Sequence, residues 1–551
     1  MKKIYRNGLL MLAMGALAVS CADYNTVDDF AADPDPSFSE PYKDLNPIKS
    51  YIDRDKYPNM TLGATLKVTD FNKQELAHAA ALTNFDNLAF GTTLMSGSII
   101  NAKGVMNFLN FKDLLDHVDE IGGEVFGSPL FANTNQADGW LDMLTAPVVI
   151  PVDFIEEKTV NYNDSTKFSG TTDKGTAGSI AKYDNQNALK IATNAQVRII
   201  EGFKVDPKSK YTITFWARSD KQASYSITFS GRTIEGSGAN GRWNFSEGKW
   251  VKVVVENVQA AEGVTDGYLR IENTRTGVIY VQKVEAGYFP DNHREMSEQE
   301  KKDTIDYAIN KWCEGLMEIN AGRINSFDLI DEPIDDKAQL ENGMYDLKHS
   351  KEKIFWQDVL GSENYAPQVS KEASAAYEKY GGDPALLKFF IAESGLEDAK
   401  KFESLKYWLD IWDRNGAKID GINAKVNLVY SEDAAKQEEN KKSFETLLEN
   451  LAATGKLVRI SNFDIKYQDA SGLNVTAANI TAEQRQKLAD YNAYVIKAYM
   501  SKIPSAQQAG LCKGNLADTS DPVGLWSIAK PSNDWVRTAT YKAFCDALSG
   551  K

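Results

Sequence analysis

The sequence contains few of the residues on which several protein classes depend. Four cysteines in 551 residues are too few for a disulfide framework, and no Cys/His cluster has the spacing of a metal site. Acidic residues outnumber basic ones, 77 to 62, and the net charge of −15 argues against a nucleic-acid partner. The Gly-rich stretch Gly236–Gly241 lies within a β-rich segment, which is the wrong context for a phosphate loop. We therefore expect no metal, no cofactor and no nucleic acid.

The composition is that of a folded protein. Hydrophobic residues make up 42% and charged residues 25%, which excludes disorder over most of the chain. The length allows about three to five domains, or one large barrel with a smaller module.

The amino terminus has the pattern of a targeting segment. A basic start precedes the apolar stretch Leu9–Val19, which is too short to cross a bilayer, and no later run of about 20 apolar residues follows. The stretch ends in Leu17-Ala18-Val19-Ser20-Cys21, which resembles a bacterial lipobox. We expect residues 1–21 to be a lipoprotein signal with lipidation at Cys21, and residues 22–57 a flexible tether. Early acidic residues in the tether suggest the outer-membrane, cell-surface anchoring seen in Bacteroidota.

Eight short apolar runs alternate with helical patterns such as Lys73–Leu82, Phe111–Val118 and Glu298–Ile319. Strands that alternate with helices predict a parallel sheet, and eight such units predict a (β/α)8 barrel. The runs are Leu62–Val68, Asn87–Leu94, Glu124–Phe131, Asn325–Ile330, Leu387–Ala392, Ile419–Leu428, Leu457–Ile465 and Ala509–Leu516.

The gap between the third and fourth runs is too long for one helix. Its stretches rich in β-branched and aromatic residues alternate with period two, which is typical of strands. We therefore predict an α/β protein in which an all-β sandwich, residues 152–289, is inserted after the third strand of a barrel formed by residues 58–151 and 290–551. Phe215, Phe229 and Trp250 are expected in the sandwich core.

Several motifs resemble glycoside hydrolase family 10, the retaining endo-xylanases. Phe327-Asp328-Leu329-Ile330-Asp331-Glu332-Pro333 is similar to the family's W-D-V-V-N-E-P at the end of strand four. Ile419-Asp420-Gly421-Ile422 and Pro522-Val523-Gly524-Leu525-Trp526 also fit, in the same order. The resemblance implies a barrel, with Glu332 at the position of the catalytic acid/base. It also implies that the insert is a carbohydrate-binding module, as is common in members from gut Bacteroidota.

The rest of the family's catalytic pattern is degenerate. The nucleophile motif I-T-E-L-D-I corresponds to Ile460-Ser461-Asn462-Phe463-Asp464-Ile465, so Asn462 stands where the nucleophilic carboxylate belongs. An amide is a poor nucleophile at a sugar carbon and carries no charge to stabilise an oxocarbenium ion. Asn133 and Asn427 replace family histidines, and no Trp stands near Cys512-Lys513-Gly514.

Some polar and aromatic residues remain as candidates. Glu393 and Asp464 are possible replacement carboxylates or structural acids. Asn133, Glu393 and Asn427 could bind sugar in the cleft, and Trp243, after the Gly-rich loop, could stack on a sugar ring in the insert.

The leading hypothesis is a lipid-anchored, non-catalytic protein that binds xylan or a related hemicellulose for neighbouring enzymes and an outer-membrane importer. The first alternative is an active endo-β-1,4-xylanase, or a glycosidase on another glycan, that uses Glu332 with a relocated second carboxylate. The second alternative is a scaffold that binds protein partners in a glycan-uptake complex.

Overall fold

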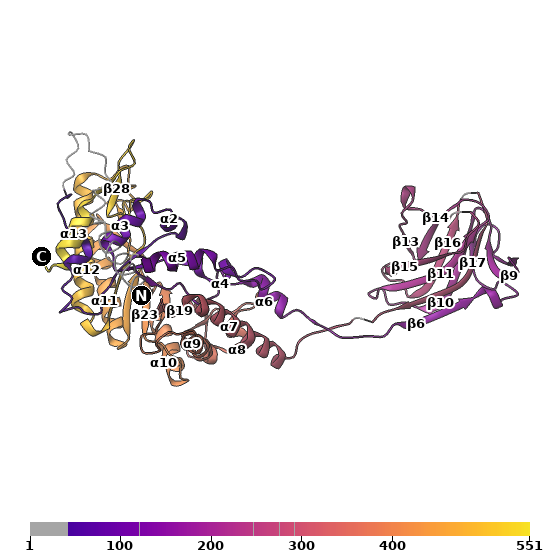
Figure 1. The fold of residues 1–551 in the computed structure, drawn as a ribbon, viewed down its shortest axis with the longest axis horizontal. Helices are drawn as coiled ribbons and strands as arrows, with labels where there is room; N and C mark the ends of the chain where they lie inside the picture. The colour runs from indigo at the N-terminus through magenta and orange to yellow at the C-terminus, as the bar shows by residue number, and fades with distance from the viewer. Residues whose placement is uncertain (1–41, 121, 246, 275, 291) are drawn as a thin grey trace, which may run out of the picture. The chain divides into compact units, whose positions relative to one another are not determined.

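The computed structural model describes residues 42–551 with the exception of residues 121, 246, 275 and 291. The chain divides into two compact units, one made of residues 42–146 with Ser297–Lys551 and the other of Pro147–Met296 (Figure 1).

The first unit is built on a sheet of parallel strands. Its strand order is β3-β2-β1-β27-β25-β23-β22-β19-β4. An isolated parallel bridge between Gly127 and Phe327 joins the end of β3 to β19, so the two margins of the sheet meet. Every predicted apolar run overlaps one of these strands, which confirms the barrel fold. The strands are β1 Leu62–Thr65, β2 Asn87–Ala89, β3 Glu124–Phe126, β4 Phe131–Ala132, β19 Ser326–Asp331, β22 Lys388–Ser394, β23 Gly421–Lys425, β25 Leu457–Ser461 and β27 Gln508–Lys513.

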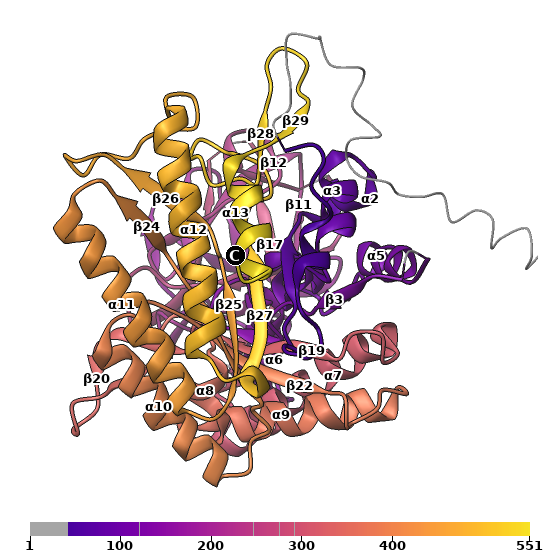
Figure 2. The same cartoon turned by 90° about the vertical axis from the view of Figure 1, so that its left-hand side faces the viewer.

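Helices connect the strands and cover the outside of the sheet. Their starts are encoded locally: Asp398 and Asp433 accept backbone N–H bonds at the starts of α10 and α11, and Ser297 forms a capping box at α7. Neighbouring helices pack side by side, as α11, α12 and α13 do in Figure 2. The helices are α2 Val68–Asn72, α3 Leu76–Asn84, α4 Ser96–Ile99, α5 Leu109–Glu120, α6 Asp138–Leu144, α7 Glu298–Asn320, α8 Trp356–Leu360, α9 Ser362–Lys379, α10 Ala399–Arg414, α11 Ala434–Ala453, α12 Ala482–Lys502 and α13 Ala539–Leu548.

The packed part of the chain begins earlier than the predicted tether boundary at residue 57. Ile48 and Ile52 are buried in the barrel core. The Arg537 guanidinium donates to the backbone carbonyls of Tyr42, Lys43 and Leu45. Residues 42–57 therefore belong to the barrel unit, because two isoleucines among polar neighbours are enough to anchor them. None of the helices in the described ranges is both long and apolar enough to cross a membrane.

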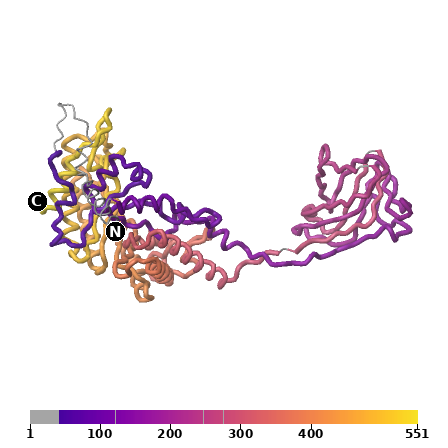
Figure 3. Tube along the Cα trace, viewed as in Figure 1, coloured from indigo at the N-terminus to yellow at the C-terminus, as the bar shows by residue number. Residues whose placement is uncertain are grey.

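The second unit consists of two antiparallel sheets that enclose their own apolar core. One sheet has the order β13-β12-β16-β10-β7, with β14 beside β12; the other has the order β15-β11-β17-β9-β8, with β6 beside β17. The entering strand β5 (Val148–Val149) pairs with the leaving strand β18 (His293–Arg294). Figure 3 traces the chain into and out of this unit. The sheets are made of β6 Ile155–Asn161, β7 Thr172–Lys174, β8 Ser179–Tyr183, β9 Gln186–Ile191, β10 Ala195–Lys204, β11 Tyr211–Ser219, β12 Ala223–Phe229, β13 Arg232–Ile234, β14 Trp243–Phe245, β15 Val251–Val258, β16 Asp266–Asn273 and β17 Ile279–Tyr288.

The closure of the barrel depends on a glycine. A Cβ at position 127 would lie 2.1 Å from the buried Phe327 ring, so we expect Gly127→Ala to displace this ring and lower the free energy of unfolding by about 1–3 kcal/mol. Gly315→Ala, inside α7, is the control because its Cβ would meet the flexible Met106 side chain and would add helix propensity. Chemical denaturation of both variants tests this, and equal stabilities would contradict it.

Candidate functional site

Glu332 stands at the carboxyl end of β19 in a strained backbone conformation. Its φ angle is 46°, in the left-handed region that glutamate rarely adopts, and it precedes Pro333. Its backbone N–H donates to the carbonyl of Ala392 on the neighbouring strand at 2.8 Å. Such strain costs about 1–3 kcal/mol and is typical of functional sites.

Two lysines surround the Glu332 carboxylate. Lys425 Nζ lies 3.3 Å from Oε1 and Lys348 Nζ lies 3.8 Å from Oε2. Burial alone would raise the pKa of Glu332, but the attraction of the two ammonium groups outweighs it, and the pKa lies below its usual range. Glu332 is therefore an ionised hydrogen-bond acceptor at neutral pH and a poor proton donor.

Lys425, the last residue of β23, was missed in the sequence analysis. It pairs with both Asp331 and Glu332, and its side chain is 20% exposed. Burial would lower the pKa of Lys425, but the attraction of Asp331 outweighs burial and raises it. The sequence could have indicated Lys425, because functional side chains in barrels stand at the carboxyl ends of strands and Lys425 lies near the end of the predicted run Ile419–Leu428.

Asn462 follows β25 and is exposed, with a φ of 54° that asparagine tolerates better than most residues. Its neighbour Ser461 is in register with Lys425. The predicted nucleophile position therefore carries an amide, and the strand beside it ends in a cation.

Two hollows open at this end of the barrel, and Lys425 and Asn462 border both. The smaller one, about 210 Å³, also reaches Asp328, Asp331 and Arg459. The larger one, about 380 Å³, is lined mainly by polar groups. Among the described residues, neither hollow has a tryptophan in its wall.

The larger hollow contains, besides Lys425 and Asn462, the predicted Asn427 and a residue that was missed, Glu397. Asn427 is exposed and lines the hollow, together with Glu397. Burial raises the pKa of Glu397, and hydrogen bonds from its own backbone N–H and that of Asn427 offset this in part. Glu397 lies four residues beyond Glu393, the residue that the sequence analysis had predicted as a candidate carboxylate.

Glu393 does not face the hollows. Its side chain is completely buried, accepts from the Ile334 backbone N–H at 3.1 Å and lies 3.1 Å from Lys401 Nζ. Burial raises the pKa of Glu393, and the attraction of Lys401 offsets only part of this effect. These contacts favour a structural role.

Asp464 is also engaged in structure. It accepts from Lys513 Nζ at 2.5 Å and from Asn515 Nδ2 at 2.6 Å, and so holds the end of β27 against β25. Phe131 and Phe463 are buried in the barrel core.

Asn133 lies just beyond β4 and is 8% exposed. Its Oδ1 accepts from Gln357 Nε2 at 3.1 Å. This buried contact fixes the turn after β4, and direct binding of a sugar by Asn133 stays a prediction.

Two charged groups lie deeper in the barrel. Burial, followed by repulsion from Asp331, raises the pKa of Asp328 to about 7, and both Asp328 oxygens accept from Asn423 Nδ2. Arg459 is 1% exposed, and its guanidinium carbon lies 3.9 Å from the centroid of the Phe126 ring.

The remaining predicted residues lie elsewhere. Trp243 is partly buried against the core of the second unit, and its indole N–H donates to the Ile234 carbonyl at 3.1 Å. Sugar binding by Trp243 stays a prediction, although an inward-packed ring has less surface for stacking. Cys21 lies outside the described residues.

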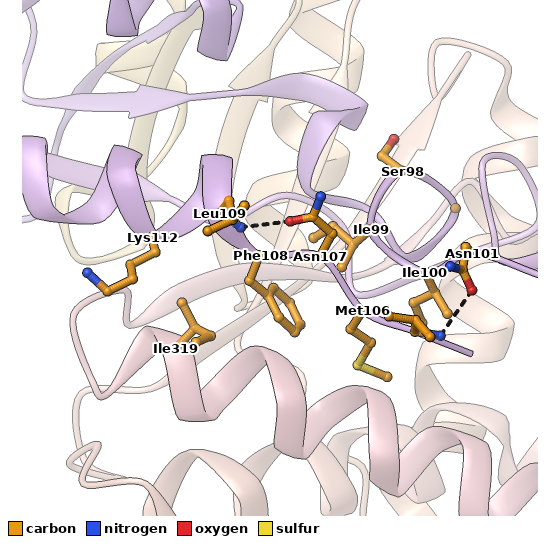
Figure 4. Close-up of a pocket in the computed structure, with 12 residues that line it drawn as sticks. Ser98, Ile99, Ile100, Asn101, Met106, Asn107, Phe108, Leu109, Lys112 and Ile319 are labelled. Carbon is orange, nitrogen blue, oxygen red and sulfur yellow. Dashed lines mark hydrogen bonds between the residues drawn. The ribbon is translucent and has the colours of Figure 1, made fainter. Parts of the chain in front are cut away.

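A larger hollow of about 870 Å³ lies between the segment that connects α4 to α5 and the helices α5 and α7 (Figure 4). Its wall includes Ile99, Met106, Phe108 and Ile319. Of the described residues that line it, Lys112 alone is ionisable, so the hollow is unsuited to acid/base chemistry. Nowhere in the described ranges do three His, Cys, Asp or Glu side chains form a group that could hold a metal ion.

Comparison with known proteins supports the barrel reading. Residues 288–515 match the model described as Glycosyl hydrolase family 10. Xylanase B from Clostridium stercorarium F9 is 10% identical with a TM-score of 0.50, over 91% of this chain and 100% of that chain. A family 10 endoxylanase from a sugarcane soil metagenome is 9% identical with a TM-score of 0.50, over 92% of this chain and 100% of that chain. No curated protein matches the chain. The family resemblance is thus confirmed for residues 288–515, and the solved structures confirm the fold.

The buried Glu393–Lys401 pair should contribute strongly to stability. Lys401→Met leaves a buried carboxylate without its cation, so we expect it to lower the free energy of unfolding by about 3 kcal/mol at pH 7. Lys406→Met, which removes an exposed pair with Asp410 in the same helix, should cost about 0.5 kcal/mol or less. Urea denaturation measures both, and equal losses would contradict the structural role of Glu393.

Asp328 should make stability depend on pH. Its folded pKa of about 7 exceeds the 3.8 of a free aspartate, so the folded state binds more protons between these values, and stability falls as the pH rises through this window. Asp328→Asn cannot ionise and should flatten the slope between about pH 4 and pH 7. Denaturation midpoints across this range test it, with the exposed Asp410→Asn as a control that keeps the slope. A wild-type slope in Asp328→Asn would refute the assignment.

Proposed function

We propose that this protein binds a xylan-like hemicellulose at the mouth of a family 10-type barrel and does not hydrolyse it. The observation that carries the proposal is the position of Lys425. It forms an ion pair with Glu332 and stands in register beside the residue that precedes Asn462.

Retaining hydrolysis needs an acid that protonates the leaving oxygen and a second carboxylate that attacks the sugar carbon. Glu332 has a lowered pKa, which is opposite to what a general acid requires. Asn462 supplies no charge and little nucleophilicity. Each half of the catalytic pair is therefore impaired for a separate chemical reason.

The same groups are suited to hold sugar hydroxyls. Glu332 accepts hydrogen bonds, Lys425 donates them, and the exposed amides of Asn427 and Asn462 can do both. The polar lining of the larger hollow fits a hydroxyl-rich ligand better than an apolar one. The family match over residues 288–515 supports a plant hemicellulose as the ligand class.

The cellular setting is part of the proposal. Lipidation at Cys21 would anchor the protein in the outer membrane, where it would hold glycan at the cell surface for neighbouring enzymes and an importer complex. The resemblance of residues 17–21 to a lipobox supports this location.

One observation favours the alternative of an active glycosidase. Glu397 is a carboxyl group with a raised pKa in the wall that also contains Asn462, and it could serve as the relocated second carboxylate. Its pKa suits a proton donor better than a nucleophile.

Calorimetric titration of the chain from Ala22 with xylohexaose, combined with chromatography of the sugar, tests the proposal. We expect a saturating isotherm and intact hexasaccharide. Glu332→Gln should weaken binding by less than about tenfold, because one hydrogen bond among several is changed. If the wild type releases shorter sugars, and if this release stops in both Glu332→Gln and Glu397→Gln, the protein is a glycosidase instead.

A further inference from the structure

One face of the second unit exposes aromatic rings. Along β11 the side chains alternate between the core and the outside, with Phe215 and Ala217 buried and Trp216 and Arg218 outward. Trp216 is 41% exposed, and of the ten tryptophans, all within the described ranges, it alone is exposed. Part of this indole is open to a partner, and an exposed ring is informative where further rings adjoin it in one patch.

Three further rings gather beside it on this sheet. The Tyr183 and Tyr280 ring centroids are 4.7 Å apart, and Trp250 meets Tyr183 edge-on at 6.5 Å. The Arg218 guanidinium lies 4.0 Å from the Tyr183 ring centroid. Trp250 is only partly buried and lies outside the apolar core, so its predicted core position is wrong. Trp250 is two residues before Lys252, which points outward on β15, so the period-two pattern itself places Trp250 on the outer face.

The strand register places these rings in one continuous area. Arg218 is opposite Tyr280 on one side, and Trp216 is opposite Lys252 on the other. The same register, continued by two residues, brings Trp250 beside Arg218. Trp216 and Arg218 are two residues apart on one face, about 7 Å.

A β-bulge lies at this point. The pairing of β11 with β17 shifts between Phe215 and Ala217, on either side of Trp216. Bulges bend a sheet, re-aim side chains and are enriched beside functional sites.

The outer face of the other sheet is different. There Arg198 lies 3.0 Å from Asp173 and stacks on Tyr268, and Arg270 also approaches Asp173. Ion pairs thus cover that face.

We infer that the face formed by Tyr183, Trp216, Trp250 and Tyr280 is a second glycan site, which binds a neutral β-linked pyranose chain. The C–H faces of pyranose rings pack on Trp216 and the tyrosine rings, while Arg218 and its partner Asp184 hydrogen-bond to hydroxyl groups. The choice of xylan as the sugar rests on the proposed function, but the site itself does not.

The charges on the face favour a neutral ligand. Arg218 lies 2.7 Å from Asp184, and Lys283 pairs with Glu285 further along β17. These two cations are thus paired with carboxylates, and Lys252, which is opposite Trp216, is attracted to the same Glu285. The acids of this face therefore offset most of its positive charge, which leaves a polyanion little to bind. The Arg218 side chain is 13% exposed and that of Asp184 67%, so the pair offers mainly carboxylate acceptors at the edge of the aromatic area.

The test is titration of the chain from Ala22 with xylohexaose, cellohexaose and mannohexaose, monitored by calorimetry. Trp216→Ala should weaken binding of the preferred hexasaccharide at this site by about tenfold or more, and Trp216→Phe, which keeps a ring, should retain most of it. Tyr268→Ala, on the outer face of the other sheet, is the matched control and should bind as the wild type does. Thermal unfolding checks that all three variants fold.

A barrel variant, Asn427→Ala with Asn462→Ala, separates the two proposals. If it loses binding while Trp216→Ala does not, the second glycan site is overturned and the barrel proposal stands. If Trp216→Ala loses binding while the barrel variant does not, the second site stands and the barrel proposal fails. Absence of binding to all three sugars by the wild type would overturn the second site as well.

Discussion

A lysine ammonium group organises the mouth of this barrel. Lys425 pairs with Asp331 and Glu332 across the rim, and it borders both hollows there. Three ionisable groups so close together cannot titrate independently, because each favours the charged form of its opposite. The low pKa of Glu332 and the high pKa of Lys425 are two aspects of this one interaction.

The two units differ in how they could hold a sugar. The barrel mouth offers charges and amides, with no tryptophan among its described wall residues. The sheet face of the second unit offers rings at its centre and one ion pair at its edge. Hydrogen bonds at the barrel mouth would fix the orientation of a bound sugar, whereas aromatic rings that stack on a pyranose ring tolerate differences between sugars.

Much of the fold could be predicted from the sequence, because parallel barrel strands are buried on both faces and appear as apolar runs. Glu332 and Asn462 could be placed just after β19 and β25 because short motifs fixed their register. The contacts of Lys425 could not, because its partners lie on another strand almost 100 residues away. Asn133 and Glu393 are polar in sequence and buried in the structure. Their partners are Gln357, 224 residues from Asn133, and Lys401, in the helix that follows Glu393, and no motif contains either partner.

The paired strands β5 and β18 have a consequence for how the barrel forms. The bridge that closes the sheet joins Gly127 to Phe327, which are 200 residues apart in the chain (327 − 127). A contact of such long range is slow to form from an open chain, because the loop must first be closed. Once the second unit has folded, β5 and β18 hold its two ends together, and the effective loop shrinks to a few dozen residues, mostly α6 and α7. The folded insert thus shortens the loop between β3 and β19. The rate of barrel closure is therefore linked to the folding of a unit that contributes no strand to the barrel.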